Sequence, residues 1–180
     1  MNEGLIPSRY AKALYKFATE KGSAQKVYNE LGDLVNSFST HPALGKAMGN
    51  PALPARDKEQ LLATAMGGNP DDSLLRFVRL VIRNRRESFM RAIALTYQSI
   101  YRDANNIARI TVVTAVTLGN EVLDKIKALM QSKTDKTLEF VYVTDPSIIG
   151  GFILKVDSMQ LDASVNNELK KLRLKLINSK

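Results

Sequence analysis

The chain has 180 residues, of which 44% are hydrophobic and 24% are charged, a balance typical of a folded globular protein. It contains no cysteine, which excludes disulfides and thiolate metal sites, and no apolar run is long enough to span a membrane. The net charge is +8, and both halves of the chain are basic. That charge is consistent with a nucleic acid, an anionic lipid or an acidic protein as partner, and equally with a surface that only aids solubility.

The first part of the chain has helical periodicity, interrupted at proline and glycine residues. We expect helices over residues 8–21, 24–38, 44–48, 54–66, 71–84 and 88–103. Ser8 would cap the first of these helices, and Pro54 would take the first position of the fourth. About six helices with short connections predict an antiparallel bundle.

After residue 105 the periodicity becomes that of strands. We expect strands over residues 107–118, 138–143, 148–156 and 159–163, and helices over 121–133 and from Ser164 onward. The turn between the last two strands would fall at Asp157 and Ser158. The predicted fold is therefore mainly α with a small α+β part. An N-terminal six-helix antiparallel bundle over residues 1–105 is followed by a small β-α-β-β-α C-terminal domain over residues 106–180.

The first and fifth predicted helices have apolar arcs wider than a helix needs to pack on one neighbour. Either both helices are central in the bundle, or part of each apolar face is open to another helix. Small side chains on the first helix, Ala11, Ala13 and Ala18, favour a shallow groove that an amphipathic helix could enter.

A row of arginines at helical spacing follows the polar side of the fifth helix: Arg76, Arg79, Arg83 and Arg86. This arginine row could hold phosphates or carboxylates, or it could simply be a solvated face. Aromatic residues are not interleaved with it, as proteins that bind single-stranded nucleic acid usually require.

The closing helix carries an apolar seam at a spacing of 4, 3 and 4 residues, made of Val165, Leu169, Leu172 and Leu176. This seam could cover the small sheet, or it could face a helix of another protein.

No catalytic site is apparent in the sequence. His41 is the single histidine, and it stands beside a proline in a predicted break. No Walker A loop and no calcium-loop spacing occur, and Gly150-Gly151 opens no helix as a dinucleotide fingerprint would. We therefore expect no enzyme activity, no metal and no cofactor.

Short motifs in the first part of the chain carry a family resemblance. SRYAKALYKFA, residues 8–18, contains R-Y-A-x-A-L, and it resembles the first helix of the delta subunit of F-type ATP synthase, which typically has this pattern. In mitochondria this subunit is called the oligomycin-sensitivity-conferring protein. Asn50-Pro51 followed by Lys58 resembles the next landmark. LLRFVRLVIRNRR, residues 74–86, resembles the fifth helix, although Arg85 stands where the family often has glycine.

The C-terminal signature of the family is the most specific part of the resemblance. It is matched by Pro146, Gly150, Gly151, Asp162 and Ser164 within DPSIIGGFILKVDSMQLDASV. The hairpin turn and the residue before Ser164 depart from the family, which commonly has glycine in both places. The motifs occur in the family's order over nearly the whole chain.

The resemblance implies a non-catalytic stator subunit that couples rotation to ATP synthesis. Its N-terminal domain would bind the catalytic head through the N-terminal helix of an alpha subunit, in a groove between the first and fifth helices. By position, the groove residues would be Tyr10, Ala13, Leu14, Phe17, Phe77, Leu80 and Val81. The C-terminal domain would engage the peripheral-stalk b subunits through Leu169, Leu172 and Leu176.

The resemblance further implies no nucleic acid, no homo-oligomer within the complex, and attachment to the membrane only through that complex. The start at Met1 favours the cytoplasmic face of a bacterial inner membrane over the mitochondrial matrix face. Two other functions are consistent with the residues alone: a basic nucleic-acid-binding module, and an adaptor unrelated to ATP synthase.

Overall fold

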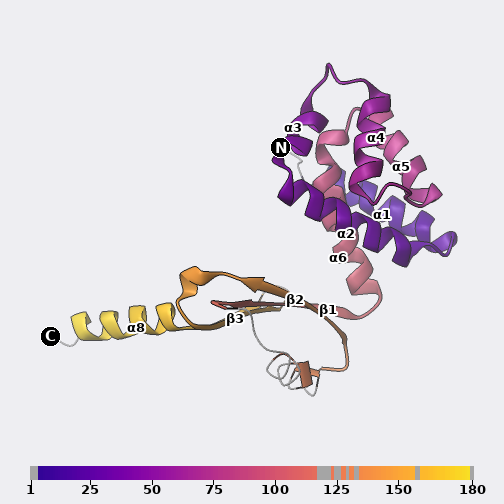
Figure 1. Cartoon of the computed structure of the whole chain (residues 1–180). Helices are drawn as coiled ribbons and strands as arrows, with labels where there is room; N and C mark the ends of the chain where they lie inside the picture. Colours follow the sequence, from indigo (N-terminus) through magenta and orange to yellow (C-terminus); the bar gives the residue numbers. More distant parts are fainter. Residues whose placement is uncertain are drawn as a thin grey trace. The chain divides into compact units, whose positions relative to one another are not determined.

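The computed structural model describes residues 4–116, 123, 127–128, 130–131, 134–156 and 159–178; the side chains of residues 175–178 are not described. The chain divides into two compact units, Met1–Ala104 and Asn105–Lys180, called here the N-terminal and C-terminal units. The predicted class, mainly helical with a small α+β part, is confirmed, since the strands form one four-stranded mixed sheet (Figure 1).

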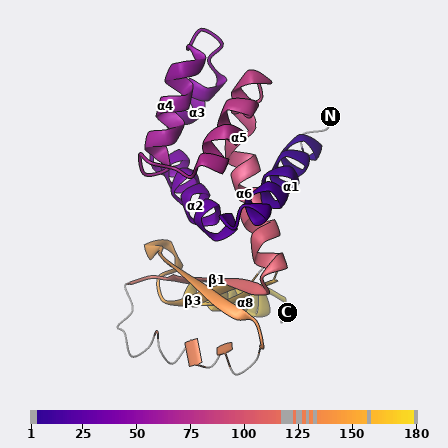
Figure 2. The ribbon, with the colours of Figure 1, turned by 90° about the vertical axis from the view of Figure 1, so that its right-hand side faces the viewer.

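The N-terminal unit is built from helices alone in its described residues. They are α1 Leu5–Glu20, α2 Ala24–Thr40, α3 Pro42–Gly49, α4 Ala55–Ala65, α5 Asp72–Arg83, the 3-10 helix η1 Glu87–Phe89 and α6 Met90–Ala104. Helix α6 packs against α1 and α2, and α1 also lies against α5 (Figure 2).

Tyr97 of α6 occupies the core of this unit and is fully buried. Its hydroxyl donates to the carbonyl oxygen of Ala24 at 3.0 Å, and the ring of Tyr15 meets its ring edge-on at 5.9 Å. Burial raises the pKa of Tyr97 above its ordinary value of 10.0. The hydroxyl therefore remains a donor throughout the ordinary pH range and joins α6 to the start of α2.

Two predicted helix starts were wrong. Helix α1 begins at Leu5, not at Ser8, because Pro7 lies in the first turn, where an N–H would have no helical partner. Ser8 is inside the helix, and its N–H donates to the carbonyl oxygen of Gly4 at 3.3 Å. Pro54 precedes α4 as its N-cap, in an extended conformation, and does not take the first helical position.

The C-terminal unit contains a sheet of strand order β2-β1-β3-β4. Its elements are β1 Ile107–Thr114, β2 Thr137–Thr144, the 3-10 helix η2 Pro146–Ile148, β3 Gly151–Val156, β4 Met159–Ser164 and α8 Val165–Asn178. Strand β1 pairs in parallel with β2 and antiparallel with β3, and β3 pairs antiparallel with β4. The inner strand β1 supplies the most buried side chains, such as Ile110 and Val112.

Parts of the predicted C-terminal elements lie outside the described residues. Of the helix expected over residues 121–133, the structure describes Leu123, 127–128 and 130–131, which are helical. The last residues expected in the first strand, 117 and 118, and the turn residues Asp157 and Ser158 are also outside.

The glycine pair was predicted inside a strand, but it forms the turn that leads into one. Strand β3 begins only at Gly151, whose φ is +75°, and Ile149 just before it has a φ of +69°. A Cβ added at Gly151 would lie 2.2 Å from the carbonyl oxygen of Ala163. The turn is tied to the last helix, because the N–H of Val165 donates to the carbonyl oxygen of Gly150 at 3.0 Å.

Helix α8 starts where predicted and leaves the sheet. The hydroxyl of Ser164 accepts from the N–H of Asn167 at 3.2 Å, which confirms Ser164 as its N-cap. The helix then extends beyond the end of the sheet and does not lie across a sheet face (Figure 1).

We predict that Gly151→Ala loosens the C-terminal unit. Positive φ combined with overlap at a backbone oxygen should cost about 2–4 kcal/mol. Hydrogen exchange of the full chain should show faster exchange in β3 and β4 and unchanged exchange in α1–α6. Gly150→Ala is the control, because its φ is not positive and its Cβ would meet only the side chain of Val165, at 3.2 Å, and no backbone atom. Equal protection in both variants would contradict the close approach at Gly151.

Candidate binding groove

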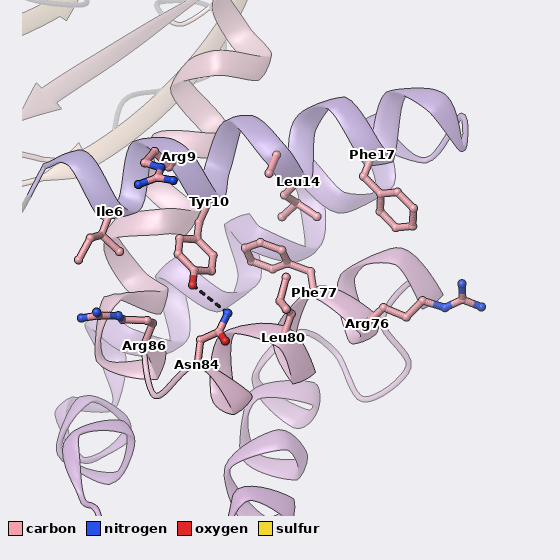
Figure 3. A pocket seen from close by; sticks show the side chains of 11 residues that line it. Ile6, Arg9, Tyr10, Leu14, Phe17, Arg76, Phe77, Leu80, Asn84 and Arg86 are labelled. Carbon is pink, nitrogen blue, oxygen red and sulfur yellow. Dashed lines mark hydrogen bonds between the residues drawn. The ribbon is translucent and has the colours of Figure 1, made fainter.

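A cavity of about 630 Å³ lies between α1 and α5 and is open to solvent. Its apolar lining comes from Ile6, Tyr10, Ala13, Leu14, Phe17, Phe77 and Leu80. Its polar lining comes from Arg9, Arg76, Asn84 and Arg86 (Figure 3). We call this cavity the α1–α5 groove.

Helix α1 has one side in the core and another in the groove, which explains its wide apolar arc. Ala11 and Ala18 are fully buried, whereas Ala13 is exposed and lines the groove. Leu14 is only 1% exposed and closes the groove floor. Both alternatives left open by the sequence therefore apply: the helix is packed on α6, and part of its face has no partner within the described chain.

Aromatic and polar contacts hold the two walls together across the groove. The rings of Tyr10 and Phe77 meet edge-on with centroids 6.1 Å apart. The side-chain amide of Asn84 donates to the Tyr10 hydroxyl at 3.0 Å (Figure 3). These contacts fix Tyr10 in place before any partner binds.

The start of α5 is anchored by a carboxylate from α2. Both carboxylate oxygens of Glu30 accept from the N–H of Asp71 at 3.0 Å, and the carboxylate of Asp71 accepts from the N–H of Ser73 at 2.9 Å. Burial raises the pKa of Glu30, although the Asp71 N–H and the ammonium of Lys26 oppose the rise. The helix start therefore depends on a residue that lies 41 positions earlier in the sequence.

The end of α5 turns sharply through a left-handed residue. Arg85 has a φ of +55°, its N–H donates to the oxygen of Ile82 at 2.9 Å, and the N–H of Arg86 donates to the oxygen of Val81 at 3.0 Å. This pair of bonds is the Schellman helix end, which favours glycine at the position of Arg85. Arg85, which stands where the family often has glycine, therefore adopts a backbone conformation that favours glycine.

A buried ion pair holds the chain just after that turn. Lys58 of α4, only 4% exposed, pairs with the carboxylate of Glu87 and also donates to the carbonyl oxygen of Met48 at 3.4 Å. Burial would raise the pKa of Glu87, but the hydrogen bond and charge of Lys58, helped by Arg85, outweigh it and hold the pKa below its ordinary 4.5. Asn84 and Arg86, which line the groove, are thereby fixed relative to α4.

Six of the seven residues proposed for the groove line it, and Val81 does not. Val81 is fully buried in the core, because it lies on the inner side of the same apolar arc. Ile6, Arg9 and Asn84 were missed. Ile6 stands one helical turn before Tyr10, so an earlier helix start would have revealed it.

The arginine row divides into different roles. Arg79 forms an ion pair with Glu59 of α4 at 2.7 Å, so it is neutralised within the chain. Arg76 of α5 lines the groove, and Arg83 is exposed at the end of the same helix. Arg86 also lines the groove, but it lies beyond the end of α5 and not on the helix as predicted, because the chain turns at Arg85.

The seam on α8 is open to solvent in its described part. Leu169 is 53% and Leu172 is 54% exposed, so these residues do not cover the sheet. The side chain of Leu176 lies outside the described residues.

The signature residues of the C-terminal unit form turns that join strands to α8. Asp162 accepts from the N–H of Ser164 at 3.0 Å, and this hydrogen bond holds its pKa below the ordinary 3.8. Asp145, next to Pro146, accepts from the N–H of Ser147 in the same way. With the close approach at Gly151, these contacts give the signature a structural role.

Among the described residues, no group of histidine, aspartate and glutamate side chains could hold a metal ion. None of the helices in that part of the chain combines the length and apolar character needed to cross a membrane.

Comparison with known proteins identifies relatives along nearly the whole chain. The family model described as ATP synthase delta (OSCP) subunit matches residues 6–176. ATP synthase subunit delta of Phocaeicola vulgatus is 42% identical over 97% of this chain and 95% of its own length. The subunit of the same name from Bacteroides thetaiotaomicron is 37% identical over 98% of this chain and 96% of its own.

A solved structure has a similar fold. It is a chain of the cryo-EM structure of the Toxoplasma gondii mitochondrial ATP synthase hexamer, with a TM-score of 0.71 and 22% identity. The likeness covers 95% of this chain and 97% of that chain. At this identity it supports the fold and nothing more specific.

We predict that the Lys58–Glu87 pair makes stability depend on pH. Because the pKa of Glu87 is lowered, its contribution should be complete above about pH 4.5 and fade as the pH falls through the folded-state pKa. Glu87→Gln should destabilise the protein by about 3 kcal/mol near neutral pH, since it leaves the Lys58 ammonium buried without its counter-charge. The difference between the two proteins should shrink below pH 4.5 in urea denaturation.

Glu59→Gln is the matched control, because it breaks the more exposed pair with Arg79. Its effect should stay below about 1 kcal/mol. A Glu87→Gln effect as small as that of Glu59→Gln would show that the buried pair does not anchor the helix end.

Proposed function

The chain belongs to the ATP synthase delta (OSCP) subunit family, and from this premise we propose how its two units carry out a stator's task. It is a non-catalytic subunit of the ATP synthase. In our proposal, the α1–α5 groove of the N-terminal unit binds the N-terminal helix of an alpha subunit on the catalytic head. The C-terminal unit binds the peripheral-stalk b subunits.

The observation that carries the proposal is the α1–α5 groove itself. Its apolar residues on α1 run from Ile6 to Phe17, a length of about 16 Å, or about three turns of a bound helix. An amphipathic helix that lays its apolar face into such a groove gains roughly 25 cal/mol for each Å² of apolar surface it buries. Burial of this kind suits permanent attachment.

The seam on α8 supports a second attachment point. Leu169 and Leu172 stand one turn apart and are more than half exposed, in a helix whose neighbouring positions carry Lys170, Lys171 and Arg173. An apolar seam of this spacing is the usual contact surface between helices. We propose that the b subunits cover it.

Each unit has a separate part in this mechanism. The N-terminal unit, which we take to be a six-helix antiparallel bundle over α1–α6, would hold the head. The C-terminal unit, of the order β-α-β-β-α, would hold the stalk. A link at both ends keeps the head from turning with the rotor, so torque is used for ATP synthesis. In this proposal the chain meets the bacterial inner membrane only through the complex, on its cytoplasmic face.

The nucleic-acid alternative loses its main support. It depended on four arginines on one face of the fifth helix, but Arg86 lies beyond the end of α5, and Arg79 is paired with Glu59. Arg76 and Arg86 border the apolar α1–α5 groove, so the four arginines do not form one continuous charged face.

Leu80→Glu should abolish binding of an alpha-subunit N-terminal peptide. Leu80 lines the groove and is 49% exposed, so a charge there should block an apolar helix without unfolding the chain. The affinity should fall at least about 30-fold, because a bound apolar helix would have to remove water from the new carboxylate, at a cost of about 2 kcal/mol or more. Calorimetric titration of the full chain measures it.

Leu95→Glu on α6 is the control, since Leu95 is similarly exposed and does not line the groove. Leu14 and Val81 are unsuitable targets, because both are buried and a charge there would disturb the fold. Equal affinity of Leu80→Glu and Leu95→Glu would count against the groove as the head-binding site.

The double variant Leu169→Glu, Leu172→Glu should lose capture of the b subunits and keep the affinity for the alpha peptide. The removed side chains are exposed, so the melting temperature should hardly change. Leu174→Glu is the matched control, as Leu174 is 59% exposed on the same helix but lies off the seam. If the double variant still captures the b subunits in a pull-down, the stalk binds elsewhere.

A further inference from the structure

The α1–α5 groove has arginines at both of its ends. Arg9 and Arg86 lie at the end near Ile6, and Arg76 lies at the end near Phe17 (Figure 3). All three side chains are exposed, and the residues that line the groove include no aspartate or glutamate. The floor between the two ends is apolar.

The arginines that border the groove have no acidic partner among the described residues, in contrast to two other cations of the N-terminal unit. Arg79 is paired with Glu59, and Lys58 is paired with Glu87. Within the described residues, Arg9, Arg76 and Arg86 take part in no ion pair. The cations that border the groove are therefore available to a ligand.

A helix in the groove would bring its flanks against these arginines and remove water from them. A charge that loses water without gaining a counter-charge opposes binding, whereas a carboxylate at the same place forms a charge-assisted, often bidentate, hydrogen bond. A helix that binds here therefore needs carboxylates opposite the arginines, in addition to an apolar face that packs on the groove floor.

We propose that the α1–α5 groove selects an amphipathic helix with a carboxylate at each end of its apolar face. One carboxylate meets Arg76, and the other meets Arg9 and Arg86. From Arg9 to Phe17 is eight residues of α1, or about 12 Å, so the two carboxylates stand about two turns apart. This inference rests on the proposed function and names the chemistry of the partner helix.

The arrangement gives selection by charge as well as by shape. An apolar helix flanked by lysines meets like charges at both ends and is rejected, although its apolar face would fit. Exposed rim charges also speed the encounter at low salt and are screened at high salt.

The test uses the full-length chain and two synthetic peptides. One is the N-terminal helix of the alpha subunit from the same complex. The other is that peptide with each aspartate and glutamate replaced by asparagine and glutamine. Titrations at about 20 mM and about 300 mM salt span weak and strong screening. The protein variants are Arg76→Gln, Arg86→Gln and, as a control at the end of α5 outside the groove lining, Arg83→Gln.

We expect Arg76→Gln and Arg86→Gln each to weaken binding of the acidic peptide about twofold to fivefold at low salt, within the range of exposed charge pairs. Neither should weaken binding of the neutral peptide, and Arg83→Gln should weaken binding of neither peptide. A loss of the same size for both peptides, or for Arg83→Gln, would overturn the proposal. So would an alpha-subunit helix with no carboxylate beside its apolar face.

Leu80→Glu separates this inference from the proposed function. If Leu80→Glu abolishes binding while the arginine variants bind like the unaltered chain, the groove is correct and the charge selection is wrong. If Leu80→Glu binds normally, the groove itself is not the site. If single-stranded DNA competes with the peptide and its binding falls in the arginine variants, the arginines serve a nucleic acid and the proposal fails.

Discussion

The rest of the N-terminal unit depends on α5 being held at both ends by buried carboxylates. Glu30 fixes the first turn through the N–H of Asp71, and Glu87 fixes the chain after the last turn through Lys58. Buried charges of this kind add little net stability, because desolvation offsets much of their attraction. Their effect is on geometry, because they hold α5 in a single position. A groove between α1 and α5 exists only if these two helices cannot pack directly against each other.

The small residues of α1 make the other wall possible. Ala11 and Ala18 let α6 approach closely on one side, and the larger Tyr10 and Phe17 are left for the groove on the other. The contacts among Tyr10, Phe77 and Asn84 then hold the groove residues in place without a ligand. Because these side chains are already ordered, binding of a partner loses less conformational entropy, and a modest buried apolar area can give tight binding.

The sequence predicted well what depends on local pattern. Periodicity located α1 to α6, although it merged the 3-10 helix η1 with α6, and the width of the arcs on α1 and α5 pointed to the groove. It could not tell which part of an arc faces the core, so Val81 was taken for a groove residue although it is buried. It placed the start of α1 at Ser8, since serine favours a cap and a proline in the first turn was given too little weight.

The periodicity of the sequence could not predict contacts between residues that are far apart in the chain. Glu59 neutralises Arg79 across 20 residues, and no feature of α5 alone separates Arg79 from Arg76. The anchors of α5 join residues 41 and 29 positions apart. The glycine pair was misread for a related reason: the need for it comes from the oxygen of Ala163, on the neighbouring strand.

The strand order of the sheet has a consequence for synthesis of the protein. Strand β1 is made first but lies between β2 and β3, so it stays unpaired on both edges until later parts of the chain leave the ribosome. The parallel pairing with β2 requires a crossover, and such non-local pairing forms slowly. The N-terminal helices end before β1 begins and can fold during translation. We therefore expect the nascent chain to have a finished groove while its sheet is still incomplete.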